Sequence, residues 1–421
     1  MKYISLNQSK TIMKGKINNK NLAYHLFVLV TIMVTFLSAC NSGAKVTESS
    51  APTETPAVTE TPVVTEKPVV DPLADLIAAA KFEGALSVIA LPRDWCNYGE
   101  VIDVFKAKYP GIEVNELNPE AGSGDQIEAI KANKDNKGPQ APDVIDVSLS
   151  FSVASRKEAL IQPYKVSTWD SIPAEAKDAD GYWYGDYYGV LSFLVNTDVQ
   201  PDVPQDWVDL LDPKYKGQVA LSGDPRVFNQ AVQSLVAFEQ AYQSVLASAL
   251  ANGGSLDNVR PGLDFFAKMN AAGNLAPIVS NNGLVASGEV PIRITWDYIA
   301  YPTVDAFAGN PKADVVIPTT GRLAGVFAQA ISAYAPHPNA AKLWMEFLYS
   351  DEGQTLWMKG YCHPIREADL RGRNVIPAEL LAKMPEVSGV VFPSLDQLKA
   401  AEVYITANWD EVVGADIQAA P

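Results

Sequence analysis

Polar and aromatic side chains follow several short apolar runs of this 421-residue chain and could form a binding site. They are Arg93, Asp94, Trp95 and Tyr98 after the run 86–90, and Trp296, Asp297 and Tyr298 at the end of the run 291–296. Aromatic rings offer flat apolar walls, while an indole N–H, a phenol or a carboxylate orients a polar ligand. A buried carboxylate is costly unless it is paired or serves a ligand. We therefore expect a ligand site here, against the alternative that the rings only roof the core.

Three further segments carry groups that could bind charge. Tyr184 and Asp186 belong to the aromatic stretch 182–189, which could hold a cation or could simply cover a sheet. Ser123, in a glycine-rich turn before a helix, could help to present backbone N–H groups to an anion, although an ordinary loop-to-helix junction would look the same. Asp224 is expected to cap a long helix that runs to about residue 251, with Pro225 at its first position and Arg226 able to reach the site.

The elements that must position these residues alternate in type along the chain. Helices are expected over 73–83, 99–109 and 126–134, and strands over 86–90, 112–114 and 144–147. Later, strands are expected at 219–221, 291–296 and 325–335, with helices at 263–272 and 338–349. A strand, a helix and a second strand within about thirty residues predict parallel pairing and an α/β fold. Ligands of such sheets bind at the carboxyl ends of strands, where the candidate residues lie.

Composition and missing motifs exclude several functions. The chain contains no G-x-S-x-G, H-E-x-x-H or phosphate-binding-loop motif, and only His25, His337 and His363 as histidines. We therefore expect no enzyme, no metal site and no cofactor. The formal charge of −16, with no basic run, argues against a nucleic-acid partner.

The N-terminal segment 1–40 resembles a bacterial lipoprotein signal. Five lysines and no acidic residue precede an apolar run that ends in Leu37, Ser38, Ala39 and Cys40. The resemblance implies lipidation of Cys40 and an extracytoplasmic protein held to the cell membrane by its lipid anchor alone; the alternative is an uncleaved anchor. Without the five lysines, the formal charge of −16 becomes −21. Residues 41–71, rich in Thr and Pro, are expected to form a disordered tether.

Cys96 and Cys362 are the two cysteines that this signal does not account for. In an oxidising compartment they could form a disulfide, and the alternative is two separate buried thiols.

From about residue 73 to 413 the chain resembles the solute-binding proteins of ABC importers, in the branch with polyamine, ferric-iron and phosphonate receptors. Three segments carry the resemblance. They are Trp95-x-x-Tyr98, the stretch 223–228 around Asp224 and Arg226, and Ile294-Thr295-Trp296-Asp297 with Tyr301.

The resemblance implies an α/β, two-lobed periplasmic-binding-protein type 2 fold with two hinge crossings, near 188–196 and 322–329. Lobe one would comprise 72–190 plus 326–361, and lobe two 191–325 plus 362–421. A monomer would close on a small solute between the lobes, with Trp95 facing Trp296 and Asp297, and deliver it to an ABC permease.

The ligand class stays open on these residues. A polyamine-like solute is the first expectation, although Gln329 stands where polyamine receptors place an acidic residue and Val227 where they place a glutamate. Ferric receptors use two adjacent tyrosines, whereas here Tyr298 and Tyr301 are three residues apart. The turn at Ser123, with Arg93 and Arg226, keeps a phosphonate or another anion open. A secreted hydrolase or a sensory lipoprotein is the alternative of another class.

Overall fold

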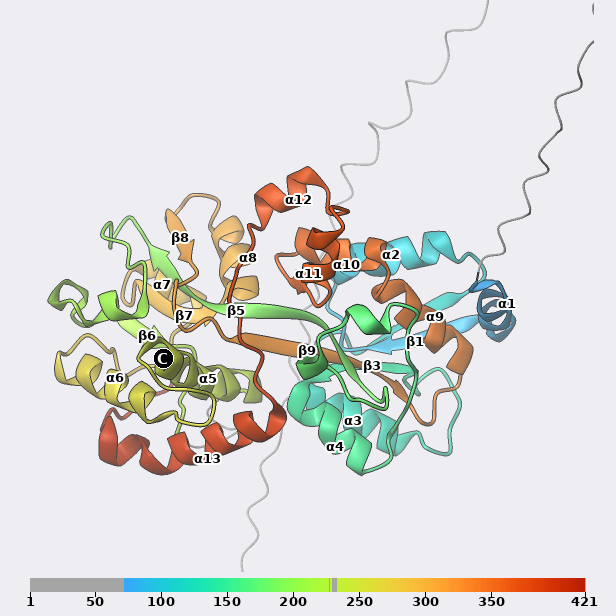
Figure 1. Cartoon of the computed structure of the whole chain (residues 1–421), viewed down its shortest axis with the longest axis horizontal. Helices are drawn as coiled ribbons and strands as arrows, with labels where there is room; N and C mark the ends of the chain where they lie inside the picture. The colour runs from blue at the N-terminus through green and yellow to red at the C-terminus, as the bar shows by residue number, and fades with distance from the viewer. Residues whose placement is uncertain (1–71, 227, 229–232, 421) are drawn as a thin grey trace, which may run out of the picture. The chain divides into compact units, whose positions relative to one another are not determined.

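The computed structural model describes residues 72–226, 228 and 233–420 (Figure 1). The predicted signal with Cys40 and the predicted tether 41–71 lie outside the described residues. Helices and strands alternate along the described chain, which confirms the mixed α/β class expected from the sequence. None of its described helices is both long enough and apolar enough to span a bilayer.

One group of elements, here called the first lobe, opens with the predicted strand–helix–strand unit. β1 (Ala85–Ile89) pairs in parallel with β2 (Glu113–Leu117), and α2 (Tyr98–Lys108) connects them. The apolar stripe predicted in α9 (Pro338–Leu348) is buried, including Trp344 and Phe347, which pack on Phe105 of α2. The other elements of this lobe are α1 (Ala74–Glu83), α3 (Ser123–Ala132), β3 (Val144–Ser148), α4 (Leu149–Lys157), β4 (Ile161–Gln162), α10 (Asp351–Lys359), β10 (His363–Pro364), α11 (Glu367–Gly372) and α12 (Ala378–Lys383).

The second lobe is built on two parallel strands, β6 (Val219–Leu221) and β7 (Ile292–Trp296). Its core contains Trp207, which packs edge-on against Phe193 and Phe265. The remaining elements are α5 (Leu235–Ala251), α6 (Arg260–Ala271), α7 (Asn282–Ser287), α8 (Asp297–Phe307), β8 (Ala313–Val316) and α13 (Leu395–Val412).

The long helix of this lobe begins later than the sequence predicted. Ser234, not Asp224, caps α5, because its hydroxyl accepts a hydrogen bond from the backbone N–H of Ala237. Asp224 is engaged elsewhere: its carboxylate binds the Arg226 guanidinium, and its own N–H donates to Gln233 Oε1 at 2.8 Å. The predicted cap at Asp224 and Pro225 is therefore wrong, since a charged partner two residues away competes for that carboxylate.

Two long strands carry the main sheet from one lobe to the other. β5 (Tyr184–Asn196) pairs with β9 (Ala324–Ser332) over its first half and with β7 and β8 over its second half. The strand order β3-β9-β5-β7-β6 thus continues through both lobes (Figure 1). β5 contains the first stretch that was expected as a crossing, 188–196, and β9 contains 324–329 of the second, 322–329.

The chain crosses between the lobes a third time, which the sequence did not predict. Segment 384–394 leads from α12 of the first lobe to α13 of the second (Figure 1). Midway, the N–H of Val391 donates to the Arg322 carbonyl at 2.8 Å, and the Ala324 N–H donates to the Val391 carbonyl at 2.9 Å. This crossing therefore runs beside the start of β9.

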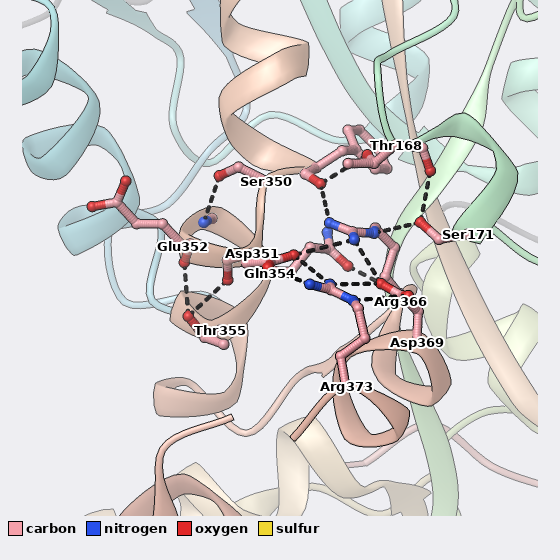
Figure 2. Close-up of polar contacts among 12 residues, drawn as sticks. Thr168, Ser171, Ser350, Asp351, Glu352, Gln354, Thr355, Arg366, Asp369 and Arg373 are labelled. Carbon is pink, nitrogen blue, oxygen red and sulfur yellow. Dashed lines mark hydrogen bonds and ion pairs between the residues drawn. The ribbon is translucent and has the colours of Figure 1, made fainter. Parts of the chain in front are cut away.

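The reason for the third crossing is that residues 362–384 pack on the first lobe, whereas the expected boundary assigned everything after 361 to the second. β10 pairs with β5 at Tyr187 and Tyr188. Figure 2 shows the buried Arg366 at the centre of this contact. Its guanidinium donates to Ser171 Oγ at 2.6 Å and to the carbonyl of Tyr349 at 2.5 Å, and it pairs with Asp369 at 2.6 Å.

Candidate functional site

A cavity of about 340 Å³ lies between the two lobes. The first lobe supplies the end of β3, the first two turns of α4 and part of β9. The second lobe supplies α5, the junction of β7 with α8, and the first half of α13. These elements present mainly aromatic and aliphatic side chains to the cavity, with a few polar groups among them.

Aromatic rings form much of the cavity wall. They are Phe151 of α4; Phe228, which precedes α5; Phe238 and Tyr242 of α5; Trp296, the last residue of β7; Tyr298 of α8; and Phe327 of β9. Trp296 and Tyr298 stack at 6.1 Å between ring centroids, with an interplanar angle of 17°. Their faces carry the negative side of a ring quadrupole, so such a wall suits an apolar body or a cation.

Two carboxylates, Glu239 of α5 and Glu402 of α13, also line the cavity. Glu239 accepts a hydrogen bond from Ser150 Oγ of the opposite lobe at 3.1 Å. Burial raises the pKa of Glu239 to about 7, against the smaller lowering effect of the Ser150 hydrogen bond. Glu402 pairs at 2.7 Å with Lys399, whose side chain is 63% exposed, so this second carboxylate lies toward the rim. Both acids therefore face the same enclosed volume from the second lobe.

Trp296, Asp297 and Tyr298 were predicted as site residues, and Trp296 and Tyr298 line the cavity. Asp297 is fully buried and engaged with the protein: Oδ1 accepts the N–H groups of Val190 and Tyr298, at 2.9 and 2.8 Å, and Oδ2 lies 2.9 Å from His363 Nε2. Its carboxylate positions the two rings on either side of it in the sequence.

His363, which sequence reasoning did not assign to the site, holds Asp297 in place. Its Nδ1 lies 2.9 Å from Glu367 Oε2, so each ring nitrogen faces a carboxylate and each must donate. Burial disfavours the imidazolium, but the charge of Asp297 and the hydrogen bonds to both carboxylates prevail and raise the pKa of His363 to about 10. A buried imidazolium thus joins the second lobe to α11 of the first.

The loop after β1 contacts the cavity wall through Trp95. This ring packs edge-on against Tyr298 at 5.2 Å and Phe327 at 6.0 Å. Since Tyr298 also stacks on Trp296, the two tryptophans share one ring as a partner. Arg93 points elsewhere and pairs with Asp103 and Glu116 on the surface, and Asp94 is exposed. The disulfide between Cys96 and Cys362 joins this loop to the residue before His363.

Tyr98, Asp186 and Gln329, also predicted as site residues, form a buried polar cluster in the first lobe with Asp146 and Tyr187. Tyr98 Oη donates to Asp146 Oδ2 at 2.7 Å, and Gln329 Nε2 donates to Tyr98 Oη at 2.8 Å and to Asp186 Oδ2 at 3.1 Å. Burial raises the pKa of Asp146, and burial together with the Asp146 charge raises that of Asp186.

This cluster lies under the cavity floor rather than in its wall. Asp146 and Gln329 are register partners, two residues along their strands from the cavity residues Ser148 and Phe327. Trp95 Nε1 donates to Tyr187 Oη at 2.8 Å, and Tyr187 Oη donates to Asp146 at 3.1 Å. A hydrogen-bond chain therefore links the cluster to the loop beside the cavity.

The other predicted residues have structural partners. Ser123 Oγ accepts the N–H of Ser148, Tyr184 is buried against Trp169 and Tyr349, and Asp224 pairs with Arg226. Arg226 also pairs with Asp416 and donates to the carbonyl of Ile417 at 2.7 Å. Its guanidinium thus ties the C-terminal segment to the second lobe, and it is not among the groups that line the cavity.

Sequence reasoning missed Glu239, Glu402, Tyr242 and Phe327. One signal for Glu239 was present: it is the only charged residue in the 17 residues of α5. A single carboxylate in an otherwise uncharged, largely buried helix needs a partner or a ligand. In the part of the chain that is described, no cluster of three or more His, Cys, Asp or Glu residues is placed to hold a metal ion.

Comparisons with known proteins agree with this architecture. A family model described as "Bacterial extracellular solute-binding protein" matches residues 140–399. The chain is 28% identical over 252 residues to an uncharacterized protein of Haemophilus influenzae, covering 57% of this chain and 66% of the relative. It is 32% identical over 120 residues to a probable ABC transporter periplasmic-binding protein of Sinorhizobium fredii, covering 28% of this chain and 32% of the relative. The chain thus spans less than two thirds of these two relatives.

Two longer alignments involve proteins with named ligands. A putative 2-aminoethylphosphonate-binding periplasmic protein of Salmonella typhimurium is 26% identical over 335 residues, covering 76% of this chain and 85% of the relative. The spermidine/putrescine-binding periplasmic protein of Escherichia coli is 27% identical over 300 residues, covering 68% of this chain and 76% of the relative. Among solved structures, a Bordetella ferric binding protein superposes with a TM-score of 0.57 at 22% identity, covering 79% of this chain and 99% of that one. This match confirms the periplasmic-binding-protein fold.

Proposed function

Because the chain belongs to the bacterial extracellular solute-binding protein family, a family of binding proteins rather than enzymes, we propose that it captures a small organic cation. The solute carries at least one ammonium group and is held in the cavity between the lobes. The loaded protein then delivers it to the permease of an ABC importer.

The pair Glu239 and Glu402 within an aromatic wall is the observation that carries this proposal. An ammonium group that leaves water needs a counter-charge, and a carboxylate with hydrogen-bond geometry provides one. A ring face within about 6 Å adds roughly 0.5–2 kcal/mol for each cation–π contact. Among the described residues that line the cavity, Lys399 is the one basic residue, and it is mostly exposed and already paired.

Names of two relatives support an amine. The Salmonella protein is named for 2-aminoethylphosphonate and the Escherichia coli protein for spermidine and putrescine, and all three compounds contain a primary amine. The acidic net charge of the chain favours the same class, since a negative surface attracts cations before contact.

The proposal extends to the location of the protein, outside the cytoplasm at the cell membrane, and to its partner, the permease. The Leu37–Cys40 sequence favours lipidation of Cys40, with residues 41–71 as a spacer between the membrane and the folded lobes. A lipid-anchored, extracytoplasmic monomer would keep its solute close to the permease.

A thermal-shift screen tests the ligand class. We expect putrescine, spermidine or 2-aminoethylphosphonate to raise the melting temperature, because a ligand that binds only the folded state stabilises it. The neutral 1,4-butanediol, which has hydroxyl groups in place of both amines of putrescine and carries no oxyanion, should leave it unchanged. In Glu402→Gln the amine-induced shift should shrink, whereas Glu411→Gln, an exposed acid on the same helix, should behave as wild type. An equal shift from 1,4-butanediol and putrescine, or no shift from either putrescine or spermidine, would reject an ammonium ligand.

Ferric iron is a second candidate that one observation favours. Tyr242 and Tyr298 line the cavity together with Glu239 and Glu402, and phenolate and carboxylate oxygens are hard donors. Against iron, burial and the charge of Asp297 raise the pKa of Tyr298 well above its ordinary value, which opposes formation of a phenolate. Ferric citrate in the same screen distinguishes the two: a shift with ferric citrate and none with the amines would favour iron.

A further inference from the structure

Arg293 of β7 is unusual among the arginines of the described chain. Arg93, Arg156, Arg226, Arg260, Arg366, Arg371 and Arg373 each lie within ion-pair distance of a carboxylate. Among described residues, only Arg293 and Arg322 have no such partner. Arg322 donates instead to the carbonyl groups of Pro318 and Ser388. Arg293 is thus a guanidinium without a counter-ion in a strongly acidic protein.

Two neutral groups orient the Arg293 side chain. Its Nε donates to Ser222 Oγ at 2.8 Å, and its Nη1 donates to Asn282 Oδ1 at 2.7 Å. Ser222 is in turn fixed, since its hydroxyl donates to the Ile294 carbonyl at 2.7 Å. These two bonds leave Nη2 with no acceptor among the described residues. Nη2 is therefore held in a defined direction and is free to donate to a ligand.

The surroundings make this unpaired charge costly. The Arg293 side chain is half-buried, and burial lowers its pKa to about 10. A guanidinium that loses part of its hydration is stabilised by an anion that replaces the lost water contacts. Its planar donors match two oxygens of a phosphate, phosphonate or carboxylate group.

The position of Arg293 also fits a ligand. Arg293 is the second residue of β7, where it pairs with Ala220 of the parallel strand β6. Its side chain reaches Ser222, which directly follows the last residue of β6. Asn282 is exposed, so the group it orients can be reached from solvent. Ser280, which lies beside the end of β6 through its N–H bond to Leu221, has a buried hydroxyl without a partner in the described structure.

We propose that Arg293, oriented by Ser222 and Asn282, forms an oxyanion-binding site on the second lobe, separate from the cavity between the lobes. None of these three residues is among those that line that cavity. The site takes one oxyanion group, either as a free inorganic ion or as part of a larger solute. It does not depend on the proposed amine ligand.

Calorimetric titration of the purified protein in an oxyanion-free buffer tests this site. Inorganic phosphate, methylphosphonate and acetate are titrated separately. Binding of phosphate alone indicates a free inorganic ion, and binding of methylphosphonate or acetate indicates a group of a larger solute. Wild type should bind at least one of them. Arg293→Met should weaken that binding by about tenfold or more, because the charge-assisted bonds are lost. Arg260→Met, which removes an exposed arginine paired with Asp264, should bind as wild type.

Stability separates a ligand site from a structural role. Without an oxyanion, Arg293→Met should melt at or above the wild-type temperature, because an unpaired, half-buried charge is removed. Adding the anion should then raise the melting temperature of wild type and not of the variant. If Arg293→Met does not fold, Asn282→Ala, an exposed change, should weaken anion binding about threefold through the loss of orientation.

Three results would overturn the proposal: no binding of any of the three anions to wild type, unchanged binding to Arg293→Met, or unchanged binding to Asn282→Ala when Arg293→Met is unfolded. Glu402→Gln keeps this test independent of the proposed function. It should impair amine binding and leave anion binding intact, so each site can fail alone.

Discussion

The two carboxylates of the cavity differ in environment, and we expect them to contribute differently to binding an ammonium group. Glu239 is held against the opposite lobe by Ser150, and its proton affinity is raised by burial. Glu402 lies beside the exposed Lys399 and is partly neutralised by it. We therefore expect Glu239 to supply most of the counter-charge for an ammonium group and Glu402 to contribute near the rim.

The affinity for an amine should depend on pH through Glu239. An ammonium ion favours the carboxylate, so the proton held with a pKa of about 7 must leave on binding. The dissociation constant should therefore rise by up to about tenfold for each pH unit below 7 and level off above 8. Titration calorimetry between pH 5.5 and 8.5 measures this. A flat profile in wild type would show that Glu239 does not meet the cation.

The contribution of His363 to folding stability decreases as pH rises, whereas the affinity for an amine through Glu239 decreases as pH falls. Its folded-state pKa of about 10 lies above the unfolded value near 6.5, so its contribution is fully present below 6.5 and is lost as pH rises through 10. His363→Gln should lower the free energy of unfolding at pH 6 by about 3–5 kcal/mol, since two buried carboxylates lose their cation. Urea unfolding measures this.

The half-buried His337, which pairs with Asp143, provides a comparison for that variant. His337→Gln should lower the free energy of unfolding less than His363→Gln. Its one partner, the Asp143 carboxylate, keeps the backbone N–H groups of Ser87 and residue 337 as donors. Equal losses in the two variants would contradict the special role given to His363.

At the scale of elements, the crossing strand β9 positions Trp296 of the cavity wall, because the Trp296 ring packs directly against the backbone at Gly325. A Cβ at Gly325 would lie 2.7 Å from the Trp296 ring, and the backbone there is not in the left-handed region. Gly325→Ala should therefore displace Trp296, destabilise the fold by about 1–3 kcal/mol and weaken solute binding. Gly372→Ala, where a Cβ meets no atom within 4 Å, is the matched control for thermal melting and calorimetry. An alanine at 325 that binds as well as wild type would remove Trp296 from the ligand wall.

The disulfide between Cys96 and Cys362 links two elements whose neighbouring residues, Trp95 and His363, contact Tyr298 and Asp297. It ties the loop of Trp95 to the strand of His363 across 266 residues of sequence. Cys96→Ser with Cys362→Ser should lower the free energy of unfolding by about 3 kcal/mol, because a long loop in the unfolded chain is released. Thiol titration of unreduced wild type should find neither cysteine free. Two reactive thiols at these positions would refute the bridge.

The elements that the sequence predicted well are those with a local signal. A short apolar run predicted a strand at 86–90, and apolar spacing predicted the buried stripe of α9; the structure has the strand at Ala85–Ile89 and the stripe in α9. The start of α5 was misplaced because Asp224 and Pro225 form a good local cap signal that a pairing with Arg226 overrides. Arg366 was assigned to the second lobe but packs on the first, because its partners Ser171 and Tyr349 are distant in sequence.

The candidate site was predictable in part for the same reason. Trp296 and Tyr298 end a recognisable buried strand, and both line the cavity. Glu402 lies on an exposed-looking helix whose role depends on the third crossing, which no local pattern reveals. Asp186 and Asp297 were chosen as charges amid apolar residues, yet internal partners account for both.

At the scale of the whole molecule, three crossings connect the lobes: β5, the start of β9 and segment 384–394. Backbone bonds between Val391 and Arg322 or Ala324 join the last two. Any closing motion must therefore bend these strands together, which favours a hinge about one axis. The buried link from His363 to Asp297 lies beside this hinge and couples it to the cavity wall.

The net charge of the molecule also acts on this scale. A formal charge of −16 attracts cationic solutes over distances of about a Debye length, roughly 8 Å at physiological salt. Inside the cavity, Glu239 and Glu402 continue that attraction at contact distance.

The most direct test of the account is calorimetric titration, at pH 8, of the most stabilising amine into wild type and Glu239→Gln. The account predicts one saturable site in wild type and at least tenfold weaker binding in the variant, with the fold retained. Equal affinities, or no heat from any amine in wild type, would contradict the claim that the cavity between the lobes holds an ammonium group.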